Sequence, residues 1–205
     1  MGERIILASA SPRRQELLKT IVPEFEVIPS DFDEKVPEGT VEPYDVVRYL
    51  AEMKAKQVAE SVILNIGADE ALVIGADTVV SLDGEILGKP KDRDDAIRML
   101  MELQGRSHEV YSGVSIFSVT ERKIEEYSTF YNKTIVEFMN LNEEEIAAYV
   151  DTGEPMDKAG ACAIQGLAAK FISGINGDYT NVVGLPLAEL YYRLKLYGVC
   201  KGYIA

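Results

Sequence analysis

The sequence of 205 residues contains no tryptophan, one histidine and two cysteines. Cys162 and Cys200 lie far apart without CxxC spacing, which argues against a disulfide framework or a thiolate zinc site and favours a reducing compartment, with cytosol as the default. His108 has no second histidine to work with, so Ser-His-Asp or Cys-His machinery cannot be built around another one. We interpret His108 as a structural residue that anchors the strand after it.

Long apolar runs and an excess of positive charge are also missing. No run approaches the length of a membrane span, and only a few apolar residues precede Ser9, so we expect no secretory signal and no membrane partner. The 21 basic residues are outnumbered by 34 acidic ones, giving a net charge of −13. A chain this acidic is a poor general binder of nucleic acid, although a few converging cations can still hold a small polyanion.

Repeats, low-complexity tracts and the sharp phosphate-binding patterns are absent as well. The sequence contains neither a GxxxxGK[ST] loop nor a GxGxxG turn after a strand. A phosphate site would therefore have to be built from scattered basic side chains and one helix end. The length suits one sizeable domain over residues 1–205, or one core divided into two lobes by a cleft.

Patterns of apolar residues and turn signals predict a mixed rather than purely parallel α/β sheet. We expect helices over residues 11–21, 44–63, 92–103 and 142–150, and from about 186. We expect strands over residues 4–8, 25–29, 107–119, 123–138 and 168–172, and two strands within 71–87 joined by a turn at Asp83-Gly84.

The first helix has its charges at the wrong end. Ser11 and Pro12 are typical of a helix start, yet Arg13 and Arg14 follow in the first turn, where the helix dipole disfavours cations. The two side chains could simply point to solvent. We favour the alternative that free amides and two forked guanidinium groups together hold phosphate oxygens.

Two charged residues interrupt apolar patterns. Lys54 lies on the apolar stripe of the second helix, where its stem could snorkel to the surface or reach into a cleft toward a phosphate or carboxylate. Asp77 interrupts the β-branched run "LVIGADTVV", which is costly unless the carboxylate is paired. It could cap a turn, but we favour a metal ligand or general base, with small Gly75 and Ala76 letting a ligand approach the backbone.

Three further stretches carry weaker signals. "GKPKD" places Lys89 and Lys91 close to Asp77 in the chain, although charged loops are usually only solvated. "PSDFDEK" offers three carboxylates, most often a solvated surface but also the ligand type that Mg²⁺ prefers. The Gly-rich "DKAGACAIQG" contains Gln165, which could read a base edge by hydrogen bonds, although glycine could equally serve tight turns. The three carboxylates are Asp31, Asp33 and Glu34.

These segments together resemble the Maf family of nucleoside triphosphate pyrophosphatases. "LASASPRRQELL", "AEMKAK", "VIGADTVV", "LGKPKD", "GRSHEVYSGV", "EPMDKAGACAIQG" and "GDYTNVVGLPL" match the family's blocks in order, from near residue 5 to near residue 190. The resemblance implies an elongated mixed sheet with flanking helices and two lobes around a cleft, similar to inosine triphosphatase. It also implies metal-dependent cleavage between the α and β phosphates, releasing a nucleoside monophosphate and pyrophosphate.

The resemblance assigns roles residue by residue. The aspartate of the GADT block is Asp77, the proton acceptor, and the specificity positions correspond to Arg13, Thr78 and Gln165. The "AIQG" form resembles the branch that hydrolyses dTTP and UTP, with modified pyrimidine nucleotides as further candidates, whereas a sister branch that prefers methylated GTP carries "SEG" there. Positions that line the family's pocket correspond to Ser9, Arg14, Glu34, Lys54, Lys89 and Lys91.

We expect Glu34 and Asp77 to share or flank a divalent cation, Mg²⁺ or Mn²⁺. One departure from the family is Cys162, where an aromatic residue is common, which could alter packing under the pocket. A different class of function stays open: a nucleotide-binding regulator of septum formation without essential catalysis. Family members often form dimers, but no exposed heptad or patch indicates one here.

Overall fold

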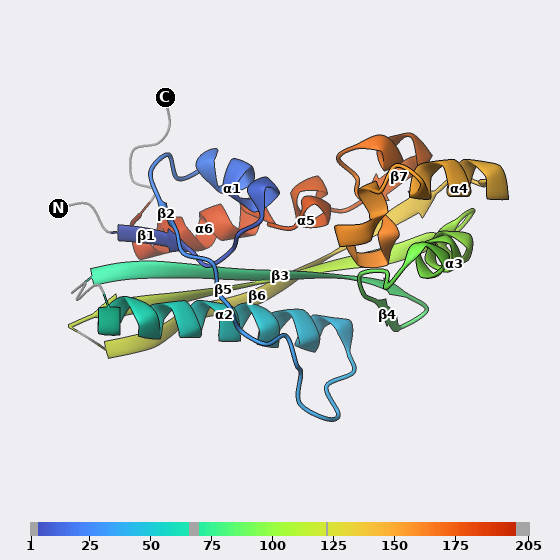
Figure 1. Ribbon diagram of the computed structural model, residues 1–205. Helices are drawn as coiled ribbons and strands as arrows, with labels where there is room; N and C mark the ends of the chain where they lie inside the picture. The colour runs from blue at the N-terminus through green and yellow to red at the C-terminus, as the bar shows by residue number, and fades with distance from the viewer. Residues whose placement is uncertain (1–3, 66–69, 122, 200–205) are drawn as a thin grey trace. The chain divides into compact units, whose positions relative to one another are not determined.

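The computed structural model describes residues 4–65, 70–121 and 123–199, and Cys200 lies outside them. Within that part of the chain, one seven-stranded sheet has the order β2-β1-β3-β5-β6-β7, with β4 paired to β3. β1 pairs in parallel with β2 and β3, whereas the pairs β3–β4 and β6–β7 are antiparallel. The prediction of a mixed sheet is confirmed (Figure 1). The strands are β1 Arg4–Leu7, β2 Glu26–Val27, β3 Glu70–Leu82, β4 Glu85–Leu87, β5 Ser107–Thr120, β6 Lys123–Phe138 and β7 Ile172–Asn176.

The helices follow the predicted order, but one predicted strand between them is wrong. The expected strand at 168–172 is instead the 3₁₀ helix η3 over Leu167–Phe171, and β7 starts only after it. The short helix α5, Tyr179–Val183, was not predicted. The remaining helices are α1 Pro12–Lys19, α2 Pro43–Asn65, α3 Arg93–Leu103, α4 Glu143–Val150 and α6 Leu187–Tyr197, with 3₁₀ helices η1 Glu154–Asp157 and η2 Ala159–Ala161.

The chain divides into two compact units. Unit 1 comprises Met1–Asp77, Ser112–Asn132 and Gly184–Ala205, and unit 2 comprises Thr78–Tyr111 and Lys133–Val183. Strands β3, β5 and β6 each contribute residues to both units. The boundary on β3 falls at the peptide bond between Asp77 and Thr78, inside the GADT block.

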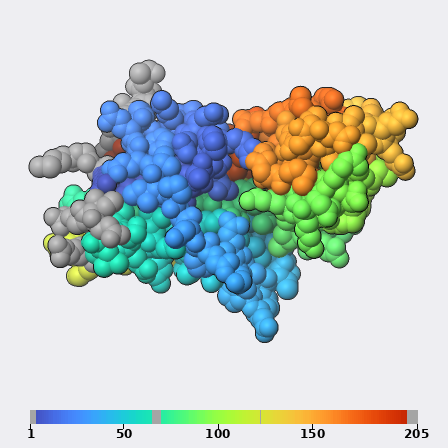
Figure 2. Space-filling view, in the orientation of Figure 1, coloured from blue at the N-terminus to red at the C-terminus, as the bar shows by residue number. Residues whose placement is uncertain are grey.

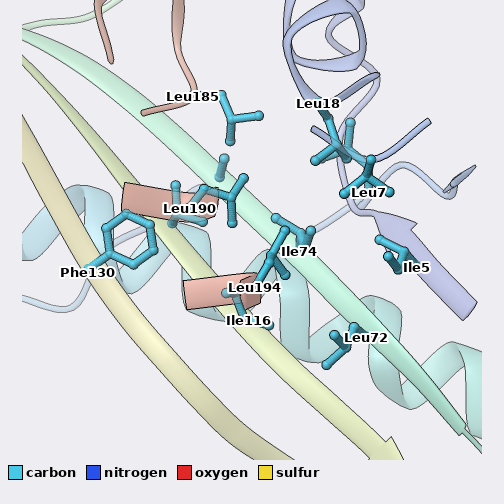
Figure 3. Packing of buried hydrophobic residues seen from close by; sticks show 13 residues of the cluster. Ile5, Leu7, Leu18, Leu72, Ile74, Ile116, Phe130, Leu185, Leu190 and Leu194 are labelled. Carbon is cyan, nitrogen blue, oxygen red and sulfur yellow. The ribbon is translucent and has the colours of Figure 1, made fainter. Parts of the chain in front are cut away.

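Unit 1 has helices on both faces of its part of the sheet. On one face, Leu72, Ile74 and Ala76 of β3 pack with α1 and α6, in the cluster that Figure 3 shows around Leu18, Leu190 and Leu194. On the other face, Ala71 and Val73 pack against α2. Successive side chains of a strand point to opposite faces. Asp77, an odd-numbered residue of this strand, therefore belongs to the α2 face.

Helix α2 lies against the sheet at two glycines. A Cβ on Gly75 of β3 would lie 2.3 Å from the carbonyl oxygen of Ala51, and one on Gly113 of β5 would lie 2.3 Å from that of Val47. Both glycines are therefore needed for close helix packing. The expectation that Gly75 lets a ligand approach is wrong, because the backbone of α2 occupies that space.

Unit 2 has its own apolar cores. Helices α3 and α4 pack with the 3₁₀ segments around Leu100, Ile146 and Phe171. A second cluster joins β3 and β4 to α3 through Val80, Leu87 and Leu103, among others. Among the described residues, no helix is both long and apolar enough to cross a membrane.

Candidate active site

Lys54 is the centre of a charge cluster in unit 1. Its Nζ donates to Oε1 of Glu34 at 2.5 Å and to Oδ1 of Asp77 at 2.6 Å. The side chains of Lys54 and Asp77 are each only 11% exposed, whereas that of Glu34 is 56% exposed. Lys54 therefore does not extend into solvent. It joins two carboxylates, in agreement with the interpretation that its side chain reaches toward a phosphate or carboxylate.

The fold explains why this lysine reaches Asp77. Lys54 stands on α2 between Ala51 and Ala55, and these two alanines are fully buried at the contact with Gly75. Asp77 is two residues farther along β3, on the same face of the sheet. Close approach of the helix backbone at Gly75 thus brings the ammonium group within hydrogen-bond distance of the carboxylate.

Glu34 reaches the cluster because its loop is docked on α2. The Gln57 side chain, three residues after Lys54, accepts from Ser30 Oγ and from the Asp31 amide, and donates to Asp31 Oδ1. The following residues, 33–39, are exposed and lie within the light blue segment in Figure 2. Gln57 is a positioning residue that the sequence interpretation missed, although its i, i+3 spacing from Lys54 placed it on the same side of the helix.

Only one of the three loop carboxylates joins Asp77. Asp31 pairs with Gln57 and Asp33 pairs with exposed Lys35, whereas Glu34 pairs with Lys54. The interpretation of this loop as a solvated surface thus holds for Asp33. Of these three carboxylates, Glu34 is the candidate oxygen ligand for a cation beside Asp77.

Arg14 makes hydrogen bonds to other segments of unit 1. Its Nε donates to the Gly184 carbonyl at 2.9 Å, and one terminal nitrogen donates to the Ala76 carbonyl at 2.9 Å and to Ser9 Oγ at 3.3 Å. Burial lowers the pKa of the Arg14 guanidinium, and the charges of Asp77 and Glu34 oppose that lowering. These contacts hold the Arg14 side chain against β3 and the segment at Gly184.

Arg13 differs from its neighbour. The predicted helix start is confirmed, since Ser11 is the N-cap and accepts from the Arg14 amide. No hydrogen bond or ion pair joins the half-buried Arg13 side chain to another residue in the described part of the chain. The expectation of an anion at this helix end therefore depends mainly on Arg13.

In unit 2, two of the sequence blocks lie side by side. The amide of Gly160, in "DKAGACAIQG", donates to the carbonyl of Gly88, in "LGKPKD", at 3.0 Å. Gly160 has φ +64°, and a Cβ there would lie 2.9 Å from Val80. The contact brings the segment before Lys89 next to the segment that leads to Gln165, and both of these side chains are exposed.

The turn at Gln165 is held by a residue that the sequence interpretation missed. Both carboxylate oxygens of Glu154 accept from the Leu167 amide at 3.0 Å, and Tyr149 donates to Glu154 from its hydroxyl at 3.1 Å. Gly166 has φ +134°, a conformation open essentially to glycine. This bound carboxylate starts η3, which is why the segment forms a helical turn and not the predicted strand.

Cys162 lies close to the same group. Burial raises the pKa of its thiol to about 12, and the charge of Glu154 adds to the rise. A thiol in this state is a weak nucleophile near neutral pH. Cys162 is consequently a packing residue, in line with the expectation that it alters packing and not chemistry.

Comparison with known proteins decides the family. Residues 4–197 match the family model described as "Maf: Maf-like protein". This chain belongs to the Maf family. A dTTP/UTP pyrophosphatase of Pelotomaculum thermopropionicum is 49% identical over 196 residues, covering 96% of this chain and 97% of its own length. A protein of the same name from Clostridium botulinum, strain Kyoto, is 50% identical over 199 residues, with 96% and 98% covered.

A solved structure is more distantly similar to this Maf protein. The Ham1 protein of Staphylococcus aureus is 19% identical, with a TM-score of 0.47, and the match covers 95% of this chain and 100% of that one.

The predicted site residues of this Maf protein fall in both units. Unit 1 holds Ser9, buried beside Arg14, and the cluster of Lys54, Glu34 and Asp77. Unit 2 holds half-buried Thr78 and exposed Lys89, Lys91 and Gln165.

The donor set fits a divalent cation only in part. Glu34 and Asp77 both reach one ammonium group, so their oxygens are near enough to flank an ion. No group of three metal-binding side chains occurs in the described ranges. Mg²⁺ is commonly held by one or two carboxylates together with substrate phosphates and water, and this Maf protein offers a shell of that kind.

Proposed function

We propose that this Maf protein hydrolyses dTTP and UTP to the nucleoside monophosphate and pyrophosphate. The observation that carries the proposal is the cluster in which Lys54 joins Asp77 and Glu34 beside Arg14. The two relatives named dTTP/UTP pyrophosphatase, matched over 96% of this chain, support the choice of substrate.

Asp77 is the proposed general base. In the free protein one of its oxygens accepts from Lys54, and the side chain is 11% exposed. A water molecule bound to the other oxygen would be turned toward the α-phosphorus and would lose its proton to Asp77 as the bond forms. The α–β bridging oxygen then leaves with pyrophosphate.

The cations of the site stabilise the negative charge of the phosphates. Lys54 can donate to a phosphate oxygen from the position that it holds beside Asp77, and Arg13 offers a forked donor at the start of α1. Lys89 and Lys91 supply further positive charge for the polyphosphate. A divalent cation held by Glu34, Asp77 and phosphate oxygens would supply neutralisation of the charge that develops during bond cleavage.

Gln165 and Thr78 are the proposed base-recognition residues. A uracil or thymine edge presents two carbonyl acceptors around one N–H donor, and a glutamine amide both donates and accepts. Thr78 adds a hydroxyl without adding charge. Glu154 positions Gln165, because it holds the turn that follows that residue.

A pyrophosphate-release assay tests the proposal. The protein is incubated with dTTP, UTP, GTP and ATP, each with Mg²⁺ and with a chelator. We expect release from dTTP and UTP with Mg²⁺, slower release from the purine nucleotides, and almost none with the chelator. Tight binding of dTTP without release would favour the regulatory function instead. The two relatives named dTTP/UTP pyrophosphatase favour the enzyme.

A further inference from the structure

The charge cluster of unit 1 contains its own cation. Lys54 Nζ lies within 2.6 Å of an oxygen of both Asp77 and Glu34, and the Lys54 side chain is only 11% exposed. The charge of Arg14 is close enough to both carboxylates to be affected by them. Both carboxylates are thus already paired with a basic group of the protein itself.

These ion pairs affect how a metal ion can bind to Asp77 and Glu34. A divalent cation bound to the same carboxylates would have to displace the ammonium group from both of them. It would also be repelled by Lys54 and Arg14, and at a weakly hydrated position this repulsion is strong. A nucleoside triphosphate changes the situation, because its phosphate oxygens offer Lys54 new acceptors.

The side chain of Lys54 can make this exchange without movement of the helix. Its backbone lies between Ala51 and Ala55, which are packed on Gly75. The four-carbon stem carries the ammonium group and can rotate. The exchange therefore needs only a change of partner, from carboxylate to phosphate.

We propose that Lys54 keeps divalent cations out of the free protein, so that the metal enters only together with the triphosphate. On arrival of the nucleotide, Lys54 moves its hydrogen bonds to phosphate oxygens and releases Glu34 and Asp77 to the metal. This inference rests on the proposed function, since it takes the metal–nucleotide complex as the ligand. It assigns Lys54 a positioning role that a purely structural ion pair would not have.

The test measures binding of Mn²⁺ alone to the full-length free protein, by the electron paramagnetic resonance signal of unbound Mn²⁺. We expect no saturable site in the wild type. The Lys54→Met variant, which keeps an apolar stem but removes the ammonium group from both carboxylates, should show a saturable Mn²⁺ site. Lys56→Met, at an exposed position two residues along α2, is the matched control and should behave as the wild type.

The melting temperature gives a second readout in case the variant is less stable than the wild type. Mn²⁺ should raise the melting temperature of Lys54→Met and leave that of the wild type unchanged, because only in the variant is the ammonium group absent from the two carboxylates. Should Lys54→Met fail to fold, the wild type and Glu34→Gln are compared, with and without a dTTP analogue that cannot be cleaved between the α and β phosphates. The wild type should then bind Mn²⁺ only with the analogue, and Glu34→Gln should bind it more weakly.

A saturable Mn²⁺ site in the free wild type that Glu34→Gln abolishes would overturn the inference. Equal Mn²⁺ binding by a folded Lys54→Met variant and the wild type would do so as well. Pyrophosphate release from dTTP by the wild type is measured separately. If release is normal while the free protein binds Mn²⁺, the metal-exclusion role is wrong and the proposed function stands.

Discussion

The Ala76 carbonyl accepts a hydrogen bond from Arg14 at 2.9 Å, one residue before Asp77. The guanidinium group thereby ties the first turn of α1 to the strand that carries the proposed base. Arg14 also binds the Gly184 carbonyl, so it holds together three segments of unit 1 that are distant in sequence. Arg14 therefore stabilises the fold through this contact, whereas Arg13 is proposed to bind phosphate. Mutation can distinguish the two roles.

Replacement of the two arginines should have different effects. Arg14→Lys exchanges a forked donor for a point charge and loses at least one of the two carbonyl contacts. We expect a loss of about 1–3 kcal/mol in the free energy of unfolding, measured by urea denaturation. Arg13→Lys should leave stability within about 0.5 kcal/mol and raise KM for dTTP. Equal stability of the two variants would contradict this division.

Asp77→Asn should abolish most of the turnover. The amide oxygen can still accept from Lys54, but the side chain can no longer take a proton from water. We expect kcat for dTTP to fall by at least ~100-fold, with an unchanged far-ultraviolet circular dichroism spectrum as the control for folding. A rate near that of the wild type would show that another group is the base.

Gln165→Glu should change which nucleotides are accepted. An ionised carboxylate can only accept hydrogen bonds, so it would face the carbonyl oxygens of uracil and thymine with a repelling charge. We expect kcat/KM for dTTP and UTP to fall roughly tenfold to a hundredfold relative to GTP. Glu154→Ala, which releases the turn after Gln165, should reduce the same preference, whereas Glu144→Ala on the exposed first turn of α4 is the matched control. Equal rates on all four nucleotides before mutation would refute the role of Gln165.

The single histidine should make stability depend on pH. His108 is 4% exposed, and burial lowers its pKa from 6.5 to about 4. The unfolded chain takes up a proton below about pH 6.5 that the folded chain refuses until about pH 4. The free energy of unfolding should therefore be fully retained above pH 6.5 and fall as the pH is lowered toward 4, by about 3 kcal/mol in all.

Urea denaturation between pH 5 and 7 checks this dependence. The paired carboxylates whose pKa values are lowered, such as Glu109, titrate below that range and contribute little to the slope. His108→Gln should flatten the curve because it removes the only histidine. A wild-type curve that is flat between pH 5 and 6.5 would exclude a neutral buried imidazole.

Gly75→Ala should displace helix α2. The added Cβ would lie 2.3 Å from the Ala51 carbonyl oxygen and 2.7 Å from the Ala55 amide nitrogen, so the helix must shift or the fold weaken. We expect a loss of about 1–3 kcal/mol in stability together with a lower kcat, because Lys54 moves with the helix. Gly88→Ala, with no atom within 4 Å of the added Cβ, is the stability control. Unchanged stability of Gly75→Ala would refute the packing argument.

Sequence patterns were sufficient for most of the helices and strands. A β-branched apolar run identified β3, apolar spacing identified α2, and Ser11 and Asp92 are the caps at the starts of α1 and α3. These signals are local, since each depends on residues within one turn or strand. An aspartate in an apolar strand and a lysine on an apolar stripe could also be recognised, because burial of charge is costly wherever it occurs.

Only the tertiary structure decided which partners those charges have. Lys54 meets Asp77 because α2 packs on Gly75, and Glu34 joins them because Gln57 holds its loop. The Arg14 side chain donates to the backbone carbonyls of Gly184 and Ala76, which its place in the first helical turn does not predict. The helical turn at 167–171 depends on Glu154 in the same way. Such contacts join residues distant in sequence, and their energies depend on distances that no local pattern contains.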